Sequence, residues 1–297
     1  MNKYVFPVLI GVIIILICIA QCNGCTSDAD YKAAVADSTQ QVLTVDDDEE
    51  EDEENIMDVS GKVYSLDSTS LELPRLTIQM PEQLLARAGY STSYNKDTRN
   101  PNWVAWHLTK EHTNGDVSRK GFGYMPDEEV GEPRQELEDW PRVNCTYDHG
   151  HMCPAADNKW SYDAMYHTFL LTNFCPQDRD LNGGDWEKLE NRCRGWARHY
   201  GDVYIACGPV YNSKNYKTLG QNKIAIPDAF FKVVLCMKGK KPKALGFIYS
   251  NEGTHHKMDY YVKTVDEVER ITGMDFFYNL PDSIENDVES HVELDKW

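Results

Sequence analysis

Hydrophobic and polar positions divide the chain into a short apolar start, a long polar stretch and a patterned body. Residues 4–20 are almost wholly apolar, whereas the residues up to about 75 are polar and acidic and have no sustained periodicity. Regular apolar patterns begin near Leu76 and continue to the C-terminus without a second linker or an internal repeat. The pattern predicts one domain at 76–297, preceded by a disordered acidic tether at 23–75.

Five segments of the body are rich in β-branched and aromatic residues and are bounded by turn-forming residues, which is typical of strands. They cover 102–109, 168–174, 202–211, 229–237 and 243–250.

Two further segments have helical spacing. In the first, Asp185 is expected to cap a helix whose apolar residues recur every three or four positions. These residues are Trp186, Leu189, Cys193 and Trp196. The second helix is expected to start after Thr264, with Glu267 completing a capping box, and to stop at Gly273. Strands and helices without regular alternation predict an α+β fold.

The net charge of −18 is concentrated, because half of it lies in one run of nine acidic residues from Asp46 to Glu54. Such a run repels itself and is typical of a solvated linker. The rest of the chain is still acidic, which argues against attraction of nucleic acid to the whole surface. A nucleic-acid site would need a local basic patch.

Residues 1–22 are predicted to be a signal peptide or membrane anchor, with a buried core helix as the alternative. Tyr4 to Ala20 follow Lys3, which is typical of an export segment and short for a spanning helix. Cys22 and Cys25 lie where a bacterial lipoprotein carries its lipid, although the residues before each fit that pattern imperfectly. An uncleaved signal anchor is the alternative to a lipid anchor. We therefore expect an exported, membrane-tethered protein of the bacterial cell envelope, with secretion left open.

Six of the nine cysteines lie in the body of the chain. In an exported domain they suggest one or more disulfides, among fifteen full pairings that the sequence does not distinguish. None of the six forms a C-x-x-C pair, which argues against a zinc ribbon or a thioredoxin-like site.

The segment "YDHGHMCPAAD", residues 147–157, concentrates polar chemistry in eleven positions. Three interpretations remain open from its spacing alone. His149 and His151 could face solvent in a turn, could bind zinc together with Cys145 or Cys153, or could supply a general base.

A second segment, "LNGGDWEKLENRCR", carries Asn182, Glu190 and Arg194 along one expected helix. Glu190 and Arg194 are four residues apart and therefore share a face. An amide, a carboxylate and a guanidinium suit an oxygen-ligated metal bound to phosphate. An exposed helix with an ordinary Glu–Arg pair is the alternative.

Taken together, the two segments resemble the DNA/RNA non-specific endonucleases of the ββα-metal class, the family of the Serratia-type nuclease and endonuclease G. The shared motifs are "DHGHMCPAAD", "TNFCPQ", "LN" and "WEKLE" followed by Arg194, in the family's order and spacing. Looser likeness extends over most of 90–281. The resemblance implies a ββα-metal (His-Me finger) nuclease fold, with a mixed or antiparallel sheet core and flanking helices.

The resemblance also implies roles in a metal-dependent hydrolysis of DNA and RNA. His151 would be the general base that activates water, and Asn182 would be the protein ligand of a single Mg²⁺, with Mn²⁺ as a substitute. Glu190 would hold water beside the metal, and Arg194 would stabilise charge in the transition state.

Four further positions follow from the same resemblance. Asn173 would orient the histidine loop, and Arg119 would be the upstream phosphate-binding arginine. Asp148 is the aspartate of the family's D-R-G-H motif and is counted with the catalytic residues. His149 replaces the arginine of that motif, so we expect a partly charged imidazole there near neutral pH and lower or acid-favoured activity.

The expected partners are DNA and RNA, held through their phosphates without base reading. A cationic strip is expected beside the catalytic helix, formed by Arg179, Lys188, Arg192, Arg194 and Arg198. The membrane is a second expected partner, through the N-terminal segment, and the oligomeric state is left open, a homodimer included. Two alternatives to an active nuclease remain. One is a weak or inactive nuclease-like protein that binds nucleic acid, and the other is a zinc-stabilised binding module.

Overall fold

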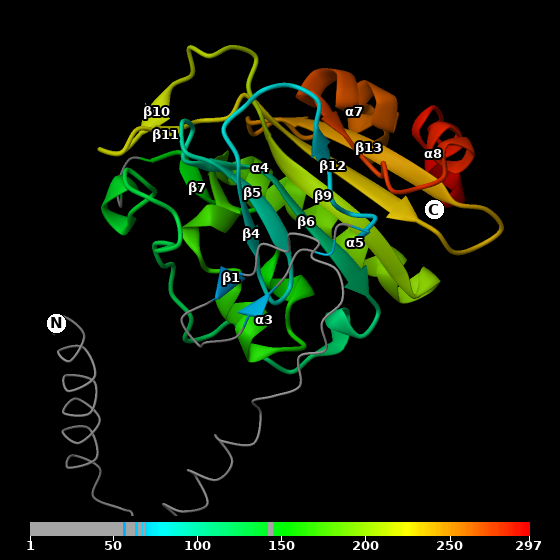
Figure 1. Ribbon diagram of the computed structural model, residues 1–297, viewed down its shortest axis with the longest axis horizontal. Helices are drawn as coiled ribbons and strands as arrows, with labels where there is room; N and C mark the ends of the chain where they lie inside the picture. Colours follow the sequence, from blue (N-terminus) through cyan, green and yellow to red (C-terminus); the bar gives the residue numbers. More distant parts are fainter. Residues whose placement is uncertain (1–55, 58–62, 65–66, 68, 142–144) are drawn as a thin grey trace, which may run out of the picture. The chain divides into compact units, whose positions relative to one another are not determined.

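A seven-stranded antiparallel sheet forms the centre of the protein in a computed structural model (Figure 1). The structure describes residues 56–57, 63–64, 67, 69–141 and 145–297, so the predicted anchor and the acidic run lie outside the described residues. The strand order is β14-β13-β12-β9-β6-β5-β4. In chain order the strands are β4 (Gln83–Ala86), β5 (Ser91–Asn95), β6 (Asn100–Thr109), β9 (Asp202–Val210), β12 (Ala229–Cys236), β13 (Lys243–Ser250) and β14 (Val262–Lys263).

The central strands are buried on both faces because each packs against a separate apolar core. Alternate residues of a strand face opposite sides, so Phe230 and Val234 of β12 belong to one core and Phe231 and Val233 to the other. Because both faces of these strands are buried, nearly every residue along them is apolar.

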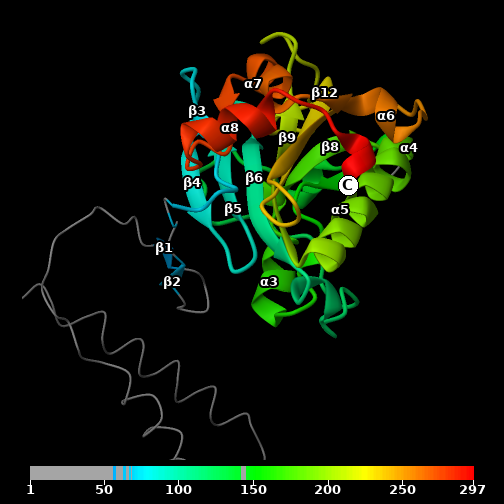
Figure 2. The same cartoon turned by 90° about the vertical axis from the view of Figure 1, so that its right-hand side faces the viewer.

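Different helices cover the two faces of the sheet (Figure 2). Helix α5 (Glu187–Tyr200) packs on the first core through the predicted apolar stripe, from Trp186 to Trp196. Helices α7 (Val265–Thr272) and α8 (Asp282–Glu289) pack on the second core through Val265, Val268 and Val288.

The remaining elements are short. Four two-stranded sheets pair β1 (Ile56–Met57) with β2 (Val63–Tyr64), β3 (Arg75–Leu76) with β15 (Met274–Asp275), β10 (Thr218–Leu219) with β11 (Ile224–Ala225), and β7 (Tyr147–His151) with β8 (Phe174–Asp178). The short helices are α3 (Tyr162–His167), α4 (Arg179–Leu181), α6 (Met258–Tyr261) and a π-helical turn at Asn182–Trp186. Single 3₁₀ turns lie at His112–Asn114, Leu137–Asp139, Ala155–Asp157, Leu171–Asn173 and Leu294–Lys296.

The α+β prediction is confirmed, and four of the five expected strands form β6, β9, β12 and β13. The strand expected at 168–174 is wrong. Residues Leu171–Asn173 form a 3₁₀ turn, and the strand starts only at Phe174. The turn closes because the Asn173 amide donates back to the Thr168 carbonyl oxygen at 3.0 Å.

The helical segment starts earlier than expected. Asp178 caps it, accepting hydrogen bonds from the N–H groups of Asp180 and Leu181. Asp185, the expected cap, instead lies inside the π-helical turn. The second expected cap is present, because the Thr264 hydroxyl accepts from the Glu267 N–H, and Gly273 adopts a left-handed conformation at the end of α7.

The disulfide expectation is wrong for the body of the chain. Its six cysteines, Cys145, Cys153, Cys175, Cys193, Cys207 and Cys236, are all free thiols. Five of them are buried and act as small core residues.

The described residues all lie within one compact unit, Glu53–Trp297. Leu73 is buried against the core beneath α7, so packing already begins a few residues before position 76. Within the described part of the chain, no helix has the length and apolar character needed to cross a bilayer.

Candidate active site

Strands β7 and β8 form an antiparallel pair that leads directly into the helical segment α4–α5. In this pair His151 lies opposite Phe174, and Gly150 lies opposite Cys175. A Cβ on Gly150 would come 2.4 Å from the Cβ of Gln177, so only glycine allows this close approach of the two strands. The glycine between the two histidines is therefore a packing requirement of the strand pair.

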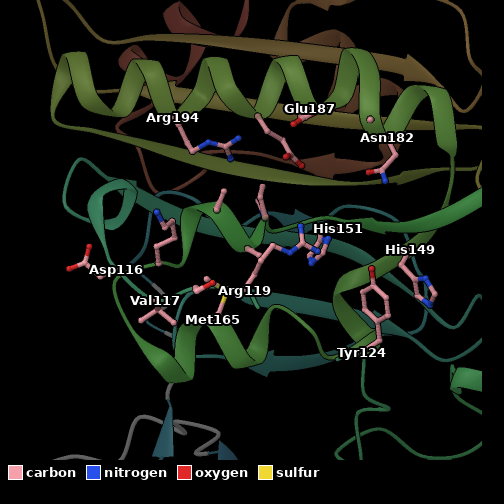
Figure 3. Close-up of a pocket in the computed structure, with 17 residues that line it drawn as sticks. Asp116, Val117, Arg119, Tyr124, His149, His151, Met165, Asn182, Glu187 and Arg194 are labelled. Atoms are coloured by element: carbon pink, nitrogen blue, oxygen red, sulfur yellow. The ribbon is translucent and has the colours of Figure 1, made fainter. Parts of the chain in front are cut away.

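A cavity of about 530 Å³ separates the strand pair from the helix (Figure 3). Asn182, Glu187 and Arg194 point into it from the helical side, and His151 points into it from β7 (Figure 3). Its further lining residues are Asp116, Val117, Ser118, Arg119, Tyr124, His149, Pro154, Ala155, Ala156, Lys159, Met165, Gly183 and Glu190. Six of the eight residues expected at the site from sequence therefore line one cavity. The exceptions are Asn173 and Asp148.

His151 presents a neutral imidazole to the cavity. Burial, together with the positive charge of Arg119, lowers the pKa of His151 to about 3. Its Nε2 atom is buried and has no hydrogen-bond partner among the described residues. A bound phosphate would offset the Arg119 charge and raise the pKa of this imidazole, making it a better base.

Asn173 holds the loop that follows His151. Its amide nitrogen donates to the carbonyl oxygens of Cys153 and Thr168 at 2.9 and 3.0 Å, and its Oδ1 accepts from the Cys153 N–H at 2.9 Å. Its own carbonyl accepts from the Met152 N–H. The side chain is fully buried and does not line the cavity. Asn173 therefore acts on the site through the backbone that carries His151.

Asn182 opens the π-helical turn that precedes α5. Its side chain forms no hydrogen bond with any described residue and faces the cavity, so its amide oxygen is available to a ligand. Gly184 interrupts the turn with φ −117° and ψ −107°. Irregular turns of this type are frequent at functional sites.

Asp185 fixes the position of this turn. Its Oδ2 accepts from the Tyr261 hydroxyl at 2.8 Å and from the His256 N–H at 3.0 Å, and Lys188 lies 2.8 Å from its Oδ1. Asp185 thus joins the turn that carries Asn182 to α6 and to the segment before it.

Glu190 contributes a carboxylate without a direct partner. Among the described residues it forms no hydrogen bond or ion pair, and burial raises its pKa to about 7. The positive charges of Lys232 and Arg194 oppose this rise. A cation in the cavity would favour the ionised form in the same way.

Arg194 is held by a buried aspartate that was not among the residues expected at the site. The Arg194 Nη1 donates to Asp157 Oδ1 at 2.7 Å, and Trp106 Nε1 donates to the other oxygen at 3.1 Å. Asp157 is the last residue of the quoted motif "YDHGHMCPAAD". The only sequence signal for Asp157 was its place in this motif, three residues after Pro154.

Lys232 is a second residue that was not expected at the site. It is fully buried on β12, with its Nζ 4.4 Å from the ring centre of Trp186 and 5.2 Å from that of Trp106. A lysine within a run of apolar strand residues was the only sequence signal. Its charge favours the ionised forms of Glu190 and Asp157.

The expected cationic strip is largely neutralised. Arg179, Lys188 and Arg194 each pair with an aspartate, and Arg192 lies over the ring of Trp196. Of the strip, only Arg194 lines the cavity, and the other basic residues there are Arg119 and Lys159. Arg119 is exposed and lies over Phe169, 5.7 Å from the ring centre.

His149 lies in an aromatic stack. Tyr124 and Trp140 sandwich its ring, with centroid distances of 4.1 and 3.8 Å. Burial lowers its pKa to about 4, so the imidazole is neutral near pH 7. The expectation of a partly charged His149 is therefore corrected: in place of the family's arginine, this chain has an uncharged ring.

Asp148 lies outside the cavity. Alternate residues of β7 face opposite sides, and the Asp148 carboxylate accepts from Arg179 Nε at 3.0 Å, where both side chains are substantially exposed. The structure gives Asp148 a surface ion pair and no contact with the cavity.

The zinc interpretation fails for the described residues. The only group there of three or more histidine, cysteine or acidic ligand atoms close enough to share an ion is Asp266, Glu269 and Glu289. His149 and His151 do not converge with Cys145 or Cys153. Cys153 is buried and accepts a hydrogen bond from Asn158.

The cavity does fit a hard divalent cation. Asn182 and Glu190 offer an amide oxygen and a carboxylate that are both free of partners among the described residues, and Mg²⁺ prefers few protein ligands of this type. The lining basic side chains suit the phosphate that would accompany the ion.

A strand pair carrying a histidine, followed by a helix carrying an asparagine across a cavity, defines the ββα-metal nuclease fold. The family model described as DNA/RNA non-specific endonuclease matches residues 68–283, well over half of the chain. The chain belongs to this family.

Individual relatives agree with this assignment. The mitochondrial nuclease EXOG of Mus musculus is 31% identical over 207 residues, which are 64% of this chain and 56% of that protein. A mitochondrial nuclease of Saccharomyces cerevisiae is 34% identical over 66% of each chain. The chain thus spans little more than half the length of the EXOG relatives that it matches.

A solved structure gives the same result for the fold. The crystal structure of an EndoG/EndoGI complex superposes with a TM-score of 0.64 at 26% identity, covering 68% of this chain and 89% of the other.

Proposed function

We propose that the protein is a divalent-metal-dependent endonuclease that hydrolyses the phosphodiester bonds of DNA and RNA without sequence preference. One observation carries the proposal: His151 on β7 faces Asn182, Glu190 and Arg194 across a single cavity. The cavity brings together a base, oxygen ligands for a cation and positive charge for phosphate.

Each residue has a distinct task. The imidazole of His151 takes the proton of the attacking water, which needs the neutral form that burial provides. Arg194, fixed by Asp157, places positive charge where the phosphate gains negative charge. Asn173 keeps the His151 loop in position through its backbone hydrogen bonds.

Asn182 would hold the cation, and Glu190 would accept hydrogen bonds from water beside it. When bound, Mg²⁺ or Mn²⁺ stabilises charge on the phosphate and on the leaving oxygen. Arg119 and Lys159 would bind flanking phosphates, which carry no base information. The neutral His149 adds no charge, so we expect catalysis to depend on Arg119, Lys159 and Arg194.

Export and membrane attachment are part of the same proposal and rest on the sequence of residues 1–22 alone. Incorporation of labelled palmitate that is abolished by Cys22→Ala would support a lipid anchor. Membrane association without labelling would support a signal anchor.

Degradation of plasmid DNA and of RNA by the full chain, with Mg²⁺, Mn²⁺ or EDTA, tests the activity. His151→Ala and Asn182→Ala should each lower the rate at least a hundredfold while the thermal unfolding temperature stays within a few degrees. His199→Ala, an exposed histidine near the end of α5, is the matched control and should keep the wild-type rate. Folded protein that leaves both substrates intact with all metals from pH 5 to 9 would instead indicate a nuclease-like binding protein.

A further inference from the structure

Three carboxylates meet on the face of the sheet opposite the cavity. Asp266 and Glu269 come from α7 and Glu289 from the end of α8, and one oxygen of each lies within 4.8 Å of the others. Helices α7 and α8 lie across the sheet from α5 (Figure 2), so this cluster is separate from the cavity that holds His151 and Asn182.

The buried carboxylate of Glu289 lacks a hydrogen-bond partner at one of its oxygens within the described part of the chain. The residue is 5% exposed, and its Oε1 has no hydrogen-bond partner among the described residues. A buried, unpaired carboxylate is costly, and this one also occupies the last residue of a helix, where the helix dipole disfavours negative charge.

Nearby basic side chains do not compensate. Arg75 pairs with Asp275, Lys263 lies 3.8 Å from Glu267, and Lys241 lies 3.7 Å from Asp287. Among the described residues, none of the three cluster carboxylates forms an ion pair with a lysine, an arginine or a histidine. These three basic residues are thus bound to other acids, and Arg270, which follows Glu269 on α7, forms no ion pair among the described residues.

The donor set and its spacing select the kind of ion. Only carboxylate oxygens are present, which suits a hard cation. Ca²⁺ lies about 2.3–2.6 Å from its oxygen ligands, so two ligands on opposite sides of it are about 4.8 Å apart. The observed separations are within this limit. Asp266 is exposed, so water can supply the remaining ligands.

We propose that Asp266, Glu269 and Glu289 form a structural Ca²⁺ site that fastens α8 to α7. Glu269 also accepts the Phe276 N–H at 2.8 Å, so the same carboxylate group connects the ion to the turn after α7. The site stabilises the C-terminal part of the fold and takes no part in the chemistry of the cavity.

The rival occupant is a proton. Burial and the neighbouring carboxylates, Glu269 first among them, raise the pKa of Glu289 to about 9, so a protonated Glu289 would also relieve the repulsion. The experiment must therefore distinguish an ion from a proton.

Calorimetric titration with Ca²⁺ and thermal unfolding of the full chain, carrying Asn182→Ala to disable the catalytic cavity, test the site. We expect one bound Ca²⁺ and an unfolding temperature raised by about 5–10 °C at a hundredfold excess over Kd. Glu289→Gln, which keeps the shape of the side chain, should weaken binding at least tenfold, and so should Asp266→Asn at the exposed edge. Glu267→Gln, also on α7 but outside the cluster, is the matched control.

Identical titrations of the parent protein and Glu289→Gln would overturn the proposal. A higher unfolding temperature of Glu289→Gln without Ca²⁺, combined with no response of the parent to Ca²⁺, would assign the site to a proton and also overturn it. If Glu289→Gln does not fold, Asp266→Asn decides alone. Nuclease activity does not enter these readouts, so they are independent of the function proposed above.

Discussion

Asp157 and Arg194, thirty-seven positions apart, form a buried ion pair with 2.7 Å between Oδ1 and Nη1. The pair joins the loop that follows His151 to the helix that follows Asn182. The two halves of the site are therefore held together by a largely buried ion pair.

Removing one partner of this pair should be costly. Asp157→Ala leaves a buried guanidinium uncompensated, and we expect a loss of about 3–5 kcal/mol in the free energy of unfolding, measured by urea titration, together with a large fall in nuclease rate. Asp148→Ala breaks an exposed pair with Arg179 and should cost less than about 1 kcal/mol. Equal losses of unfolding free energy in the two variants would show that the buried pair stabilises the fold no more than the exposed pair does.

Asn173 should affect the rate without contacting substrate. Asn173→Ala removes three hydrogen bonds to the backbone around His151, so we expect kcat to fall roughly a hundredfold with little change in KM. Asn173→Asp keeps the acceptor for the Cys153 N–H but turns a carboxylate oxygen toward the carbonyl oxygens of Cys153 and Thr168, so its rate should be no higher than that of Asn173→Ala. A change confined to KM would contradict this positioning role.

His149 should make the fold sensitive to acid. Its pKa is lowered from 6.5 to about 4 on folding, so below pH 6.5 the unfolded chain binds a proton that the folded chain does not. The free energy of unfolding therefore falls between pH 6.5 and 4, while above pH 6.5 the group has no effect. His149→Phe keeps the stack on Tyr124 and Trp140 and should weaken this dependence.

Unfolding of both proteins in urea at pH 7.5 and 4.5 measures the effect. The difference between the two pH values should be smaller for His149→Phe, with a residual part due to His151, whose pKa is lowered in the same direction. The same pH dependence in both proteins would exclude His149 as a source of it.

Lys232 should set the acid limb of the activity. Its buried charge opposes the rise in the pKa of Glu190, so Lys232→Met should move the acid limb of the pH–rate profile to higher pH. At a fixed pH below the limb, the rate should fall roughly tenfold for every pH unit by which the limb moves. Lys243→Met, which removes a lysine from the rings of Tyr200 and Trp297, is the control and should leave the profile unchanged. An unchanged profile in Lys232→Met would contradict the electrostatic link.

Arg119 should bind phosphate as an exposed cation. Arg119→Ala should raise KM for both DNA and RNA and reduce the slope of log affinity against log salt by about one. Arg179→Ala removes an arginine that is paired with Asp148 and does not line the cavity, so its salt slope should match the wild type. A sequence-dependent loss in Arg119→Ala would indicate base contact.

Much of the fold was predictable because strand composition and helical spacing are local signals. The strands β6, β9, β12 and β13 and the apolar stripe from Trp186 to Trp196 follow directly from such patterns. The strand expected at 168–174 failed for a physical reason. Its apolar residues are buried in a turn held by hydrogen bonds that Asn173 exchanges with the backbone of Cys153, twenty residues earlier.

The sequence motifs predicted the cavity residues whose own side chains supply the proposed chemistry. These are His151, Asn182, Glu190 and Arg194. Two residues that act through contacts with other elements, Asp157 and Lys232, were not predicted. Asp157 and Lys232 reach the cavity only through side chains of other elements, Arg194 and Glu190. The neutrality of His149 likewise depends on Tyr124 and Trp140, which lie outside its motif.

The irregular turn at Asn182–Trp186 corrects an angular mismatch. In a continuous α-helix, residues eight positions apart, such as Asn182 and Glu190, differ by about 80° beyond two full turns. The wider π-helical turn and the break at Gly184 change this phase, and both side chains face the same cavity. The length of the Gly183–Gly184 step therefore sets the rotational register between the amide and the carboxylate, so a single deletion there would turn one of them away without altering either residue.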